Sequence, residues 1–295
     1  MKFSPLTRAD IARLQPFLSG HPFRSCDFTV GGIFLWADAF GYSYAISHDT
    51  LFISGRAVND SSLPAFSLPL GRLPLHESVG KLLEYCEGKA HPLVLSSVPE
   101  EALPLLIDLG ARRVEQLTDW ADYVYDAEAL STFAGKKLAK KRNHINRFAA
   151  DHPDARLRDI TAADTDALTA FYERLHSTHT GPMALYDREM TLRTINHLGE
   201  YPFEAMMLEA PGCGIAAFAV GEAVGDTLHV HIEKMDHEIA GSGETVCQRF
   251  TAEMCRRHPS IRWVNRQDDS GDMGLRRAKL SLHPAFLVHK YNVVF

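Results

Sequence analysis

The sequence predicts a mixed α/β protein of two tandem halves, each with an antiparallel-rich sheet and helices packed on it. Three observations lead to this prediction. The length of 295 residues suits two domains of about 150 residues each. A Thr-x-Ala-Asp opening occurs at Thr7 and again at Thr161, each time before apolar residues at helical spacing. Strand and helix patterns alternate through both halves.

The composition excludes several classes of protein. Hydrophobic residues make up 45% and charged residues 23%, which is ordinary for a globular chain and excludes a disordered or collagen-like one. A net charge of -6 argues against a globally basic nucleic-acid binder. The 5 cysteines form no Cys-x-x-Cys pair, so we expect neither a disulfide scaffold nor a zinc site of the usual spacing. We expect no membrane span, no secretion signal at Met1–Pro5, and a cytoplasmic location.

In the first half, Thr7 and Asp10 are placed to cap a helix that buries Ile11, Leu14 and Leu18. The elements expected after it are a hairpin of strands 42–46 and 51–54, a helix near 77–87, a strand at 93–98, a helix near 100–109 and a closing strand at 121–125. Any two capped amphipathic helices would also share the features common to Thr7 and Thr161, so a duplication is one of two interpretations.

The sequence of the second half also predicts alternating helices and strands. The expected helices are one after Gly135, one after Thr161, and those at 187–198, 244–258 and 274–282; the expected strands are 204–208, 214–220, 227–235, 261–264 and one near 286–294. We place the domain boundary so that the domains are residues 1–126 and 127–295.

The segment 136–147 has the strongest compositional bias in the chain. It holds six Lys or Arg and no acidic residue, within an acidic protein. Like charges at three- and four-residue spacing destabilise a helix unless an anionic group lies opposite. The segment is therefore either a solvated face paired with acidic neighbours or a docking site for phosphates.

The run 227–235 alternates cleanly, so we expect His229, His231 and Glu233 on one face, open to a cleft or to solvent. Two imidazoles and a carboxylate can bind a metal, but with no further ligand assigned we predict none. Glu233 as a general base or charge partner, or an ordinary exposed face, is favoured instead.

The segment 264–279 joins a short strand to a helix through turn-forming residues. Asp272 is placed to cap the helix, and Arg266 lies beside Asp268 and Asp269 in the sequence. Junctions of this kind present side chains and amides where ligands bind, and they are also common as purely structural turns. Phosphate-binding loops, dinucleotide-binding loops and serine-hydrolase elbows are absent from the sequence, which argues against those enzyme classes.

Several of these segments together resemble one family, the C-terminal domain of phosphatidylglycerol lysyltransferase. The residues that carry the resemblance are Trp120–Tyr125, Gly135–Lys137, Lys141–Phe148, His231–Lys234, Val264–Gly271 and Gly274–Lys279. The resemblance implies two tandem GNAT-like domains, as in aminoacyl-tRNA-dependent transferases. Characterised members of that group move an aminoacyl group from tRNA to a lipid or a peptide amine.

The resemblance also suggests roles for individual residues. As catalytic residues we predict Glu233 or Asp268 to orient or deprotonate the acceptor, and Arg266 and Lys279 to stabilise the developing oxyanion or hold the donor. As residues that bind the co-substrate we predict Lys136, Lys137, Lys140, Lys141, Arg142, Arg147 and Asn265. The partners implied are tRNA and a small-molecule or peptide acceptor.

Two alternatives to aminoacyl transfer stay open. No bound cofactor is firmly implied, and acetyl-CoA is the alternative donor, which would make the protein a CoA-dependent N-acyltransferase. Gly241-Ser242-Gly243 departs from the Arg/Gln-x-x-Gly-x-Gly/Ala pattern with which acetyltransferases hold pyrophosphate, so this donor is not favoured. A non-catalytic module that binds an anionic ligand is the other alternative.

Overall fold

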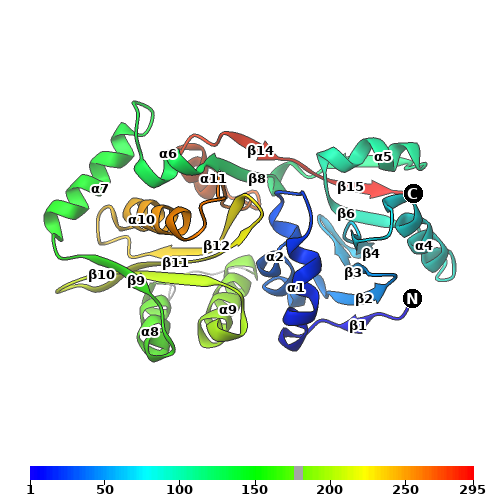
Figure 1. Cartoon of the computed structure of the whole chain (residues 1–295), viewed down its shortest axis with the longest axis horizontal. Coiled ribbons are helices and arrows are strands. Elements are labelled where there is room, and N and C mark those ends of the chain that lie inside the picture. Colours follow the sequence, from blue (N-terminus) through cyan, green and yellow to red (C-terminus); the bar gives the residue numbers. More distant parts are fainter. Residues whose placement is uncertain (176–181) are drawn as a thin grey trace. The chain divides into compact units, whose positions relative to one another are not determined.

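The computed structural model describes residues 1–175 and 182–295, and it contains two mixed sheets covered by helices (Figure 1). The predicted fold class, a tandem of α/β domains with antiparallel-rich sheets and packed helices, is confirmed. The chain forms two compact units, neither of which is continuous in sequence. The first unit comprises residues 1–123, 267–276 and 287–295, and the second comprises residues 124–266 and 277–286.

The sheet of the first unit has the strand order β1-β2-β3-β4-β6-β15-β7, with β5 paired to β3. Its strands are β1 (Ser4–Pro5), β2 (Ser43–Ser47), β3 (Thr50–Ala57), β4 (Asp60–Phe66), β5 (Leu70–Gly71), β6 (Val94–Pro99), β7 (Arg113–Gln116) and β15 (Lys290–Val294). The pairings are antiparallel except between β4 and β6, which are parallel and share the single register pair Phe66 and Leu95.

The helices of the first unit are α1 (Ile11–Ser19), α2 (Val30–Phe34), α3 (Ala37–Phe40), α4 (Leu75–Glu87) and α5 (Leu103–Asp108). The predicted cap of the first helix is confirmed as a capping box, in which Asp10 Oδ2 accepts hydrogen bonds from Thr7 N (2.9 Å) and Thr7 Oγ1 (2.7 Å). Helical spacing then buries Ile11, Leu14 and Leu18 in the core, as the sequence predicts.

The sheet of the second unit has the order β14-β8-β13-β12-β11-β10-β9. Its strands are β8 (Asp122–Asp126), β9 (Arg156–Asp159), β10 (Glu204–Ala210), β11 (Gly214–Val224), β12 (Thr227–Met235), β13 (Trp263–Asn265) and β14 (Phe286–Val288). Its helices are α6 (Ala127–Thr132), α7 (Ala139–Asp151), α8 (Thr165–Leu175), α9 (Pro182–Asn196) and α10 (Ser242–Arg257), and α11 (Met273–Leu280) begins in the first unit and ends in the second. In Figure 1, α10 covers one face of this sheet, and α8 and α9 cover the other.

The two units repeat one plan. In each, three antiparallel strands lead into a long helix and then into a strand that lies parallel to the third. Thr161 and Asp164 form a second capping box before α8, with both hydrogen bonds at 2.8 Å. The same plan in both units favours a duplication over two unrelated capped helices.

The repeats exchange one strand. The strand expected to close the first half, β8, pairs with β13 in the second sheet, and the predicted last strand near 286–294 is in fact β14 and β15, which belong to different sheets. β15 pairs with β6 and β7, so the chain end completes the first unit. The predicted division at residues 126 and 127 did not anticipate this exchange, because a strand's pairing partner cannot be deduced from its own alternation.

Gly241 fixes the junction between α7 and α10. Its φ is +83°, and a Cβ there would lie 2.4 Å from the carbonyl oxygen of His144. We therefore predict that Gly241→Ala lowers the free energy of unfolding by about 2–4 kcal/mol, from backbone strain and overpacking together. Gly80, inside α4 with open space around its Cβ position, is the control: Gly80→Ala should raise it by about 0.5–1 kcal/mol. Urea unfolding of the two variants measures both, and equal effects would contradict this account.

Candidate functional site

Three of the four predicted catalytic residues meet in the second unit, where the pairing of β12 with β13 ends. The two parallel strands are in register only from Thr227 and Trp263 to His229 and Asn265. Beyond that point Arg266 Nη2 donates a hydrogen bond of 2.5 Å to Glu233 Oε1. Their side chains are 17% and 9% exposed, so the ion pair is largely shielded from water but still reachable.

Lys279 of α11 completes this group. Its side chain is buried, and its Nζ donates to the backbone oxygen of Arg266, which fixes the chain just after β13. Burial raises the pKa of the Glu233 carboxyl, and the positive charges of Arg266 and Lys279 only partly oppose that effect. A carboxylate with a raised pKa, beside a guanidinium with further N–H donors, suits proton transfer next to a developing oxyanion.

The predicted open face on 227–235 is wrong. All residues from Thr227 to Ile232 are buried, because β12 lies inside the sheet and helices cover both faces of that sheet (Figure 1). The register steps from Val220–Ile232 to Gly221–Val230, so His231 is an extra residue that interrupts the period of two. Its ring nitrogen lies 2.8 Å from Glu222 Oε1, in a pair buried within the unit.

The basic segment splits into paired and unpaired cations. Arg142 donates to the backbone oxygens of Phe133 (2.6 Å) and Gly135 (3.1 Å), where it supports the end of α6. Lys141 lies 3.1 Å from Glu244 of α10. Burial would raise the pKa of Glu244, but the hydrogen bonds from Lys141 and His144 hold it below its usual value. Arg147 lies 3.5 Å from Asp151 on the exposed side of α7.

The other three cations of the segment are exposed. Lys136, Lys137 and Lys140 have neither a hydrogen bond nor an ion pair within residues 1–175 and 182–295. They lie before and at the start of α7, so their charges face solvent together. Asn265, by contrast, is fully buried in β13. Lys141, Arg142 and Arg147 thus fit the interpretation as paired cations, and docking of phosphates by Lys136, Lys137 and Lys140 stays a prediction.

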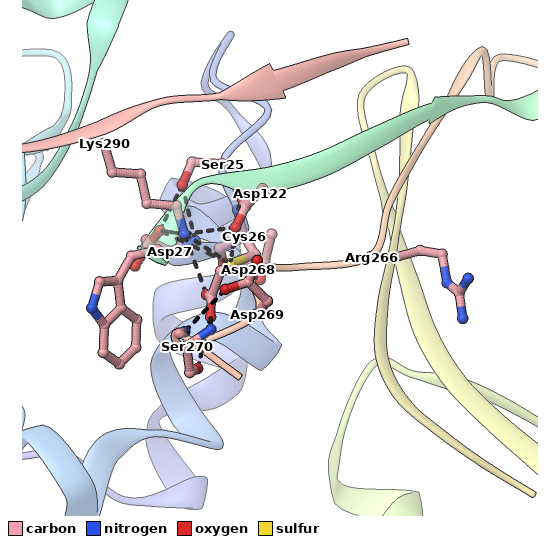
Figure 2. A network of polar contacts seen from close by, with 12 residues as sticks. Ser25, Cys26, Asp27, Asp122, Arg266, Asp268, Asp269, Ser270 and Lys290 are labelled. Atoms are coloured by element: carbon pink, nitrogen blue, oxygen red, sulfur yellow. Dashed lines mark hydrogen bonds and ion pairs between the residues drawn. The ribbon is translucent and has the colours of Figure 1, made fainter. Parts of the chain in front are cut away.

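Asp268, the fourth predicted catalytic residue, makes its contacts in the first unit. Figure 2 shows it in a cluster around the ammonium group of Lys290. Lys290 Nζ lies 2.6 Å from Asp27, 2.7 Å from Asp122 and 3.9 Å from Asp268. The Cys26 thiol donates to Asp122 at 3.2 Å and lies 3.4 Å from the ammonium. Lys290 and Asp122 are almost wholly buried.

The opposite charges of this cluster stabilise one another's charged forms. Burial would lower the pKa of Lys290, but Asp122 and Asp27 hold it well above its ordinary 10.5. Burial would raise the pKa of Asp27, but Lys290 holds it below its ordinary 3.8. Cys26, Asp122 and Asp268 offer ligand atoms within 4.8 Å of one another, an arrangement open to a metal ion. The Lys290 ammonium already supplies a positive charge to these atoms.

Sequence reasoning named Asp268 but missed the rest of this cluster. Its members come from positions near 26, 122, 268 and 290, and no two neighbouring segments share a motif. The available signal was Lys290 itself, a lysine between the apolar Phe286–Val288 and Val293–Val294, where a buried charge demands partners.

Comparison with known proteins finds a relative of part of the chain. An uncharacterised protein of Mycoplasmoides gallisepticum is 28% identical over 177 residues, covering 58% of this chain and 55% of its own length. The chain therefore spans about half the length of that relative.

Within the described residues, no helix has both the length and the apolar character needed to cross a membrane.

Solved structures show the same fold along the whole chain. A conserved protein of unknown function from Bacteroides thetaiotaomicron has a TM-score of 0.90 at 26% identity, covering 100% of this chain and 99% of that one. L-PGS from Bacillus licheniformis has a TM-score of 0.68 at 14% identity, covering 96% of this chain and 90% of that one, which shows the fold alone. Residues 21–294 match the family described as phosphatidylglycerol lysyltransferase, C-terminal, and the chain therefore belongs to that family.

Proposed function

We propose that the protein transfers an aminoacyl group from aminoacyl-tRNA to an amine or hydroxyl acceptor. The observation that carries the proposal is the shielded pair of Glu233 and Arg266, with Lys279 behind it, at the end of β12–β13 pairing. Family membership supports an aminoacyl donor, as the motif resemblance implies. The cytoplasmic location and the role of Asp268 stay predictions.

With an amine acceptor, the reaction needs one proton acceptor and one oxyanion partner. The acceptor nitrogen attacks the ester carbonyl carbon of the aminoacyl-tRNA, and Glu233 takes the proton that this nitrogen loses. Arg266 stabilises the oxyanion of the tetrahedral intermediate with an N–H that Glu233 leaves unused. The carbon–oxygen ester bond then breaks, an amide remains, and the ribose oxygen leaves with the proton returned from Glu233.

The aminoacyl-tRNA donor binds through its phosphates to exposed lysines. Lys136, Lys137 and Lys140 are exposed and unpaired in the described part of the chain, as phosphate contacts require. The start of α10 is less suited to the pyrophosphate of CoA. Glu244 places a carboxylate in its first turn, and Gly241 packs against the His144 carbonyl oxygen. The Glu244 carboxylate, paired with Lys141, stands where the helix terminus would otherwise bind an anion.

Neutralising the three exposed lysines tests the donor. In Lys136→Gln/Lys137→Gln/Lys140→Gln we expect the slope of log affinity for charged tRNA against log salt to fall by about 2–3, because three phosphate contacts are lost. Binding titrations across a salt series measure the slope, with acetyl-CoA as competitor.

The control replaces three lysines outside the segment, as Lys2→Gln/Lys81→Gln/Lys89→Gln, with the same change in net charge. We expect it to leave the slope within about one of the wild-type value, and both triple variants to keep the wild-type melting temperature. An equal loss in both triples would mean non-specific attraction, and displacement of tRNA by acetyl-CoA would favour the CoA-dependent alternative.

A further inference from the structure

The first unit contains a pocket beside the parallel strands β4 and β6. Its empty volume, open solvent included, is about 280 Å³. The pocket lies within this unit at the place equivalent to that of Glu233 and Arg266 in the second, since β4 and β6 correspond to β12 and β13. Among the residues that line it are Asp27, Arg56, Phe66 and Ser97.

Arg56 offers the pocket a positive charge. It is exposed, and within residues 1–175 and 182–295 its guanidinium has neither an ion pair nor a hydrogen bond to the protein. Its Nε and Nη2 lie 3.5 Å from the point where a Cβ on Gly41 would stand, so Gly41, with φ of +63°, lets the guanidinium lie close to the backbone. A planar guanidinium held in this way is suited to a carboxylate, which it binds through two parallel hydrogen bonds.

Asp27 offers a negative charge. Its side chain is 22% exposed, whereas Asp122 and Lys290 behind it are 0% and 2% exposed, so the buried cluster reaches the pocket through Asp27. The cluster sets three carboxylates against one ammonium, and the Cys26 thiol stays neutral because burial raises its pKa. Asp268 is also partly exposed, at 15%, but Asp27 is the carboxylate of this cluster that lines the pocket, so a further cation in the pocket would meet it there.

Ser97, which lines the pocket, has a strained backbone conformation. Its φ is +57°, in the left-handed region that disfavours residues with a side chain, and its hydroxyl is a hydrogen-bond partner of Asp27. Backbone strain of this kind is concentrated at ligand sites. The hydroxyl of Ser96, the preceding residue, instead accepts a hydrogen bond from Val58 N and donates one to Asn292 Oδ1.

We infer that this pocket binds a small zwitterion, such as a free α-amino acid, with the carboxylate on Arg56 and the ammonium at Asp27. This is a second site, it goes beyond aminoacyl transfer, and it depends on residues of the first unit alone. Because the 280 Å³ includes open solvent, it is only an upper limit on the size of the ligand, and the opposed charges of Arg56 and Asp27 favour a zwitterion over a simple amine or acid.

Calorimetric titration of the full chain tests the inference without tRNA, so its outcome is separate from that of the proposed function. The probes are glycine, L-alanine, L-serine and L-lysine, with ethylamine and propionate as ligands that each carry one of the two charges. We expect at least one amino acid to bind at least tenfold more tightly than ethylamine and propionate. Failure of all four amino acids to bind at millimolar concentration, or equal binding of ethylamine, would overturn the inference.

Arg56→Gln is the decisive variant because Arg56 is exposed and unpaired in the described chain, so its loss spares the fold. We expect it to weaken amino-acid binding at least tenfold with an unchanged melting temperature. Arg113→Gln, at an exposed arginine of β7, is the matched control and should bind as the wild type does. If Arg56→Gln binds within twofold of the wild type, the site is not this pocket.

Discussion

Replacing Glu233 by Gln is expected to lower the rate of aminoacyl transfer by a factor of about 10² to 10⁴. Gln keeps the shape of the side chain and its hydrogen bond with Arg266 but cannot take a proton, and general base catalysis is worth about that factor. Single-turnover transfer of a labelled amino acid from charged tRNA measures the change. Binding of tRNA should stay at the wild-type level, because the phosphate contacts are on other residues.

A structural role for the same ion pair would give a different pattern. Glu233→Gln leaves Arg266 without its counter-charge, which by itself destabilises the fold. The double variant Glu233→Gln/Arg266→Met removes both charges and should recover stability without recovering transfer. If the double variant regains activity together with its melting temperature, Glu233 is not the base.

The pH dependence of transfer follows from the same carboxyl. Because burial raises the pKa of Glu233, its ionised form is lost at a higher pH than for an exposed glutamate. The transfer rate should therefore fall on the acidic side at a pH above the ordinary 4.5, and this limb should vanish in Glu233→Gln.

Replacing Lys290 by Met is expected to give the largest loss of stability, about 3–5 kcal/mol or more in the free energy of unfolding. The substitution leaves Asp27 and Asp122 buried around an apolar side chain, and removing one partner of a buried ion pair costs that much. Urea unfolding at neutral pH measures the loss. Lys89→Met, at an exposed lysine of the same unit, is the control and should change the free energy by less than about 0.5 kcal/mol.

The pH dependence of the stability loss in Lys290→Met shows whether the loss comes from the missing charge or from altered packing. In the wild type, the stability due to Asp27 is present above its unfolded pKa of 3.8 and is lost as pH falls through its lower folded value. That due to Lys290 is present below 10.5 and is lost as pH rises through its higher folded value. In Lys290→Met the Asp27 carboxyl loses the charge that lowers its pKa, so its pKa rises and the deficit should shrink towards acid pH. A deficit independent of pH would mean that packing alone was lost.

Local pattern predicts most of the elements and few of the pairings. The capping boxes at Thr7 and Thr161 and the apolar spacing of α1 are local, and the sequence contains all that determines them. The exchange of β8 and β15 is not local, since alternation tells which side of a strand is buried and not which strand lies beside it. β4, with Pro64 within it, was missed because Pro is unfavourable in a strand.

The candidate site divides in the same way. Glu233, Arg266 and Lys279 stand in motifs that the sequence presents, and the structure brings them together. The His231 bulge could not be predicted, since it depends on the register with β11. Arg142 and Lys140 look alike in the sequence, yet one supports α6 and the other is free for a ligand in the described chain, because only the fold decides which cation meets a carbonyl.

The position of β15 also governs the order in which the molecule is made. Residues 1–123 leave the ribosome while the strand that fills the gap between β6 and β7 has yet to be translated, 167 positions later at residue 290. At about 5–20 residues per second the incomplete sheet waits roughly 10–30 s. The amino-terminal half therefore cannot finish before the carboxy-terminal half, and Lys290 arrives in the acidic cluster with the closing strand. A nascent chain halted before residue 290 would carry an open sheet edge, which is the part most exposed to aggregation and to chaperones.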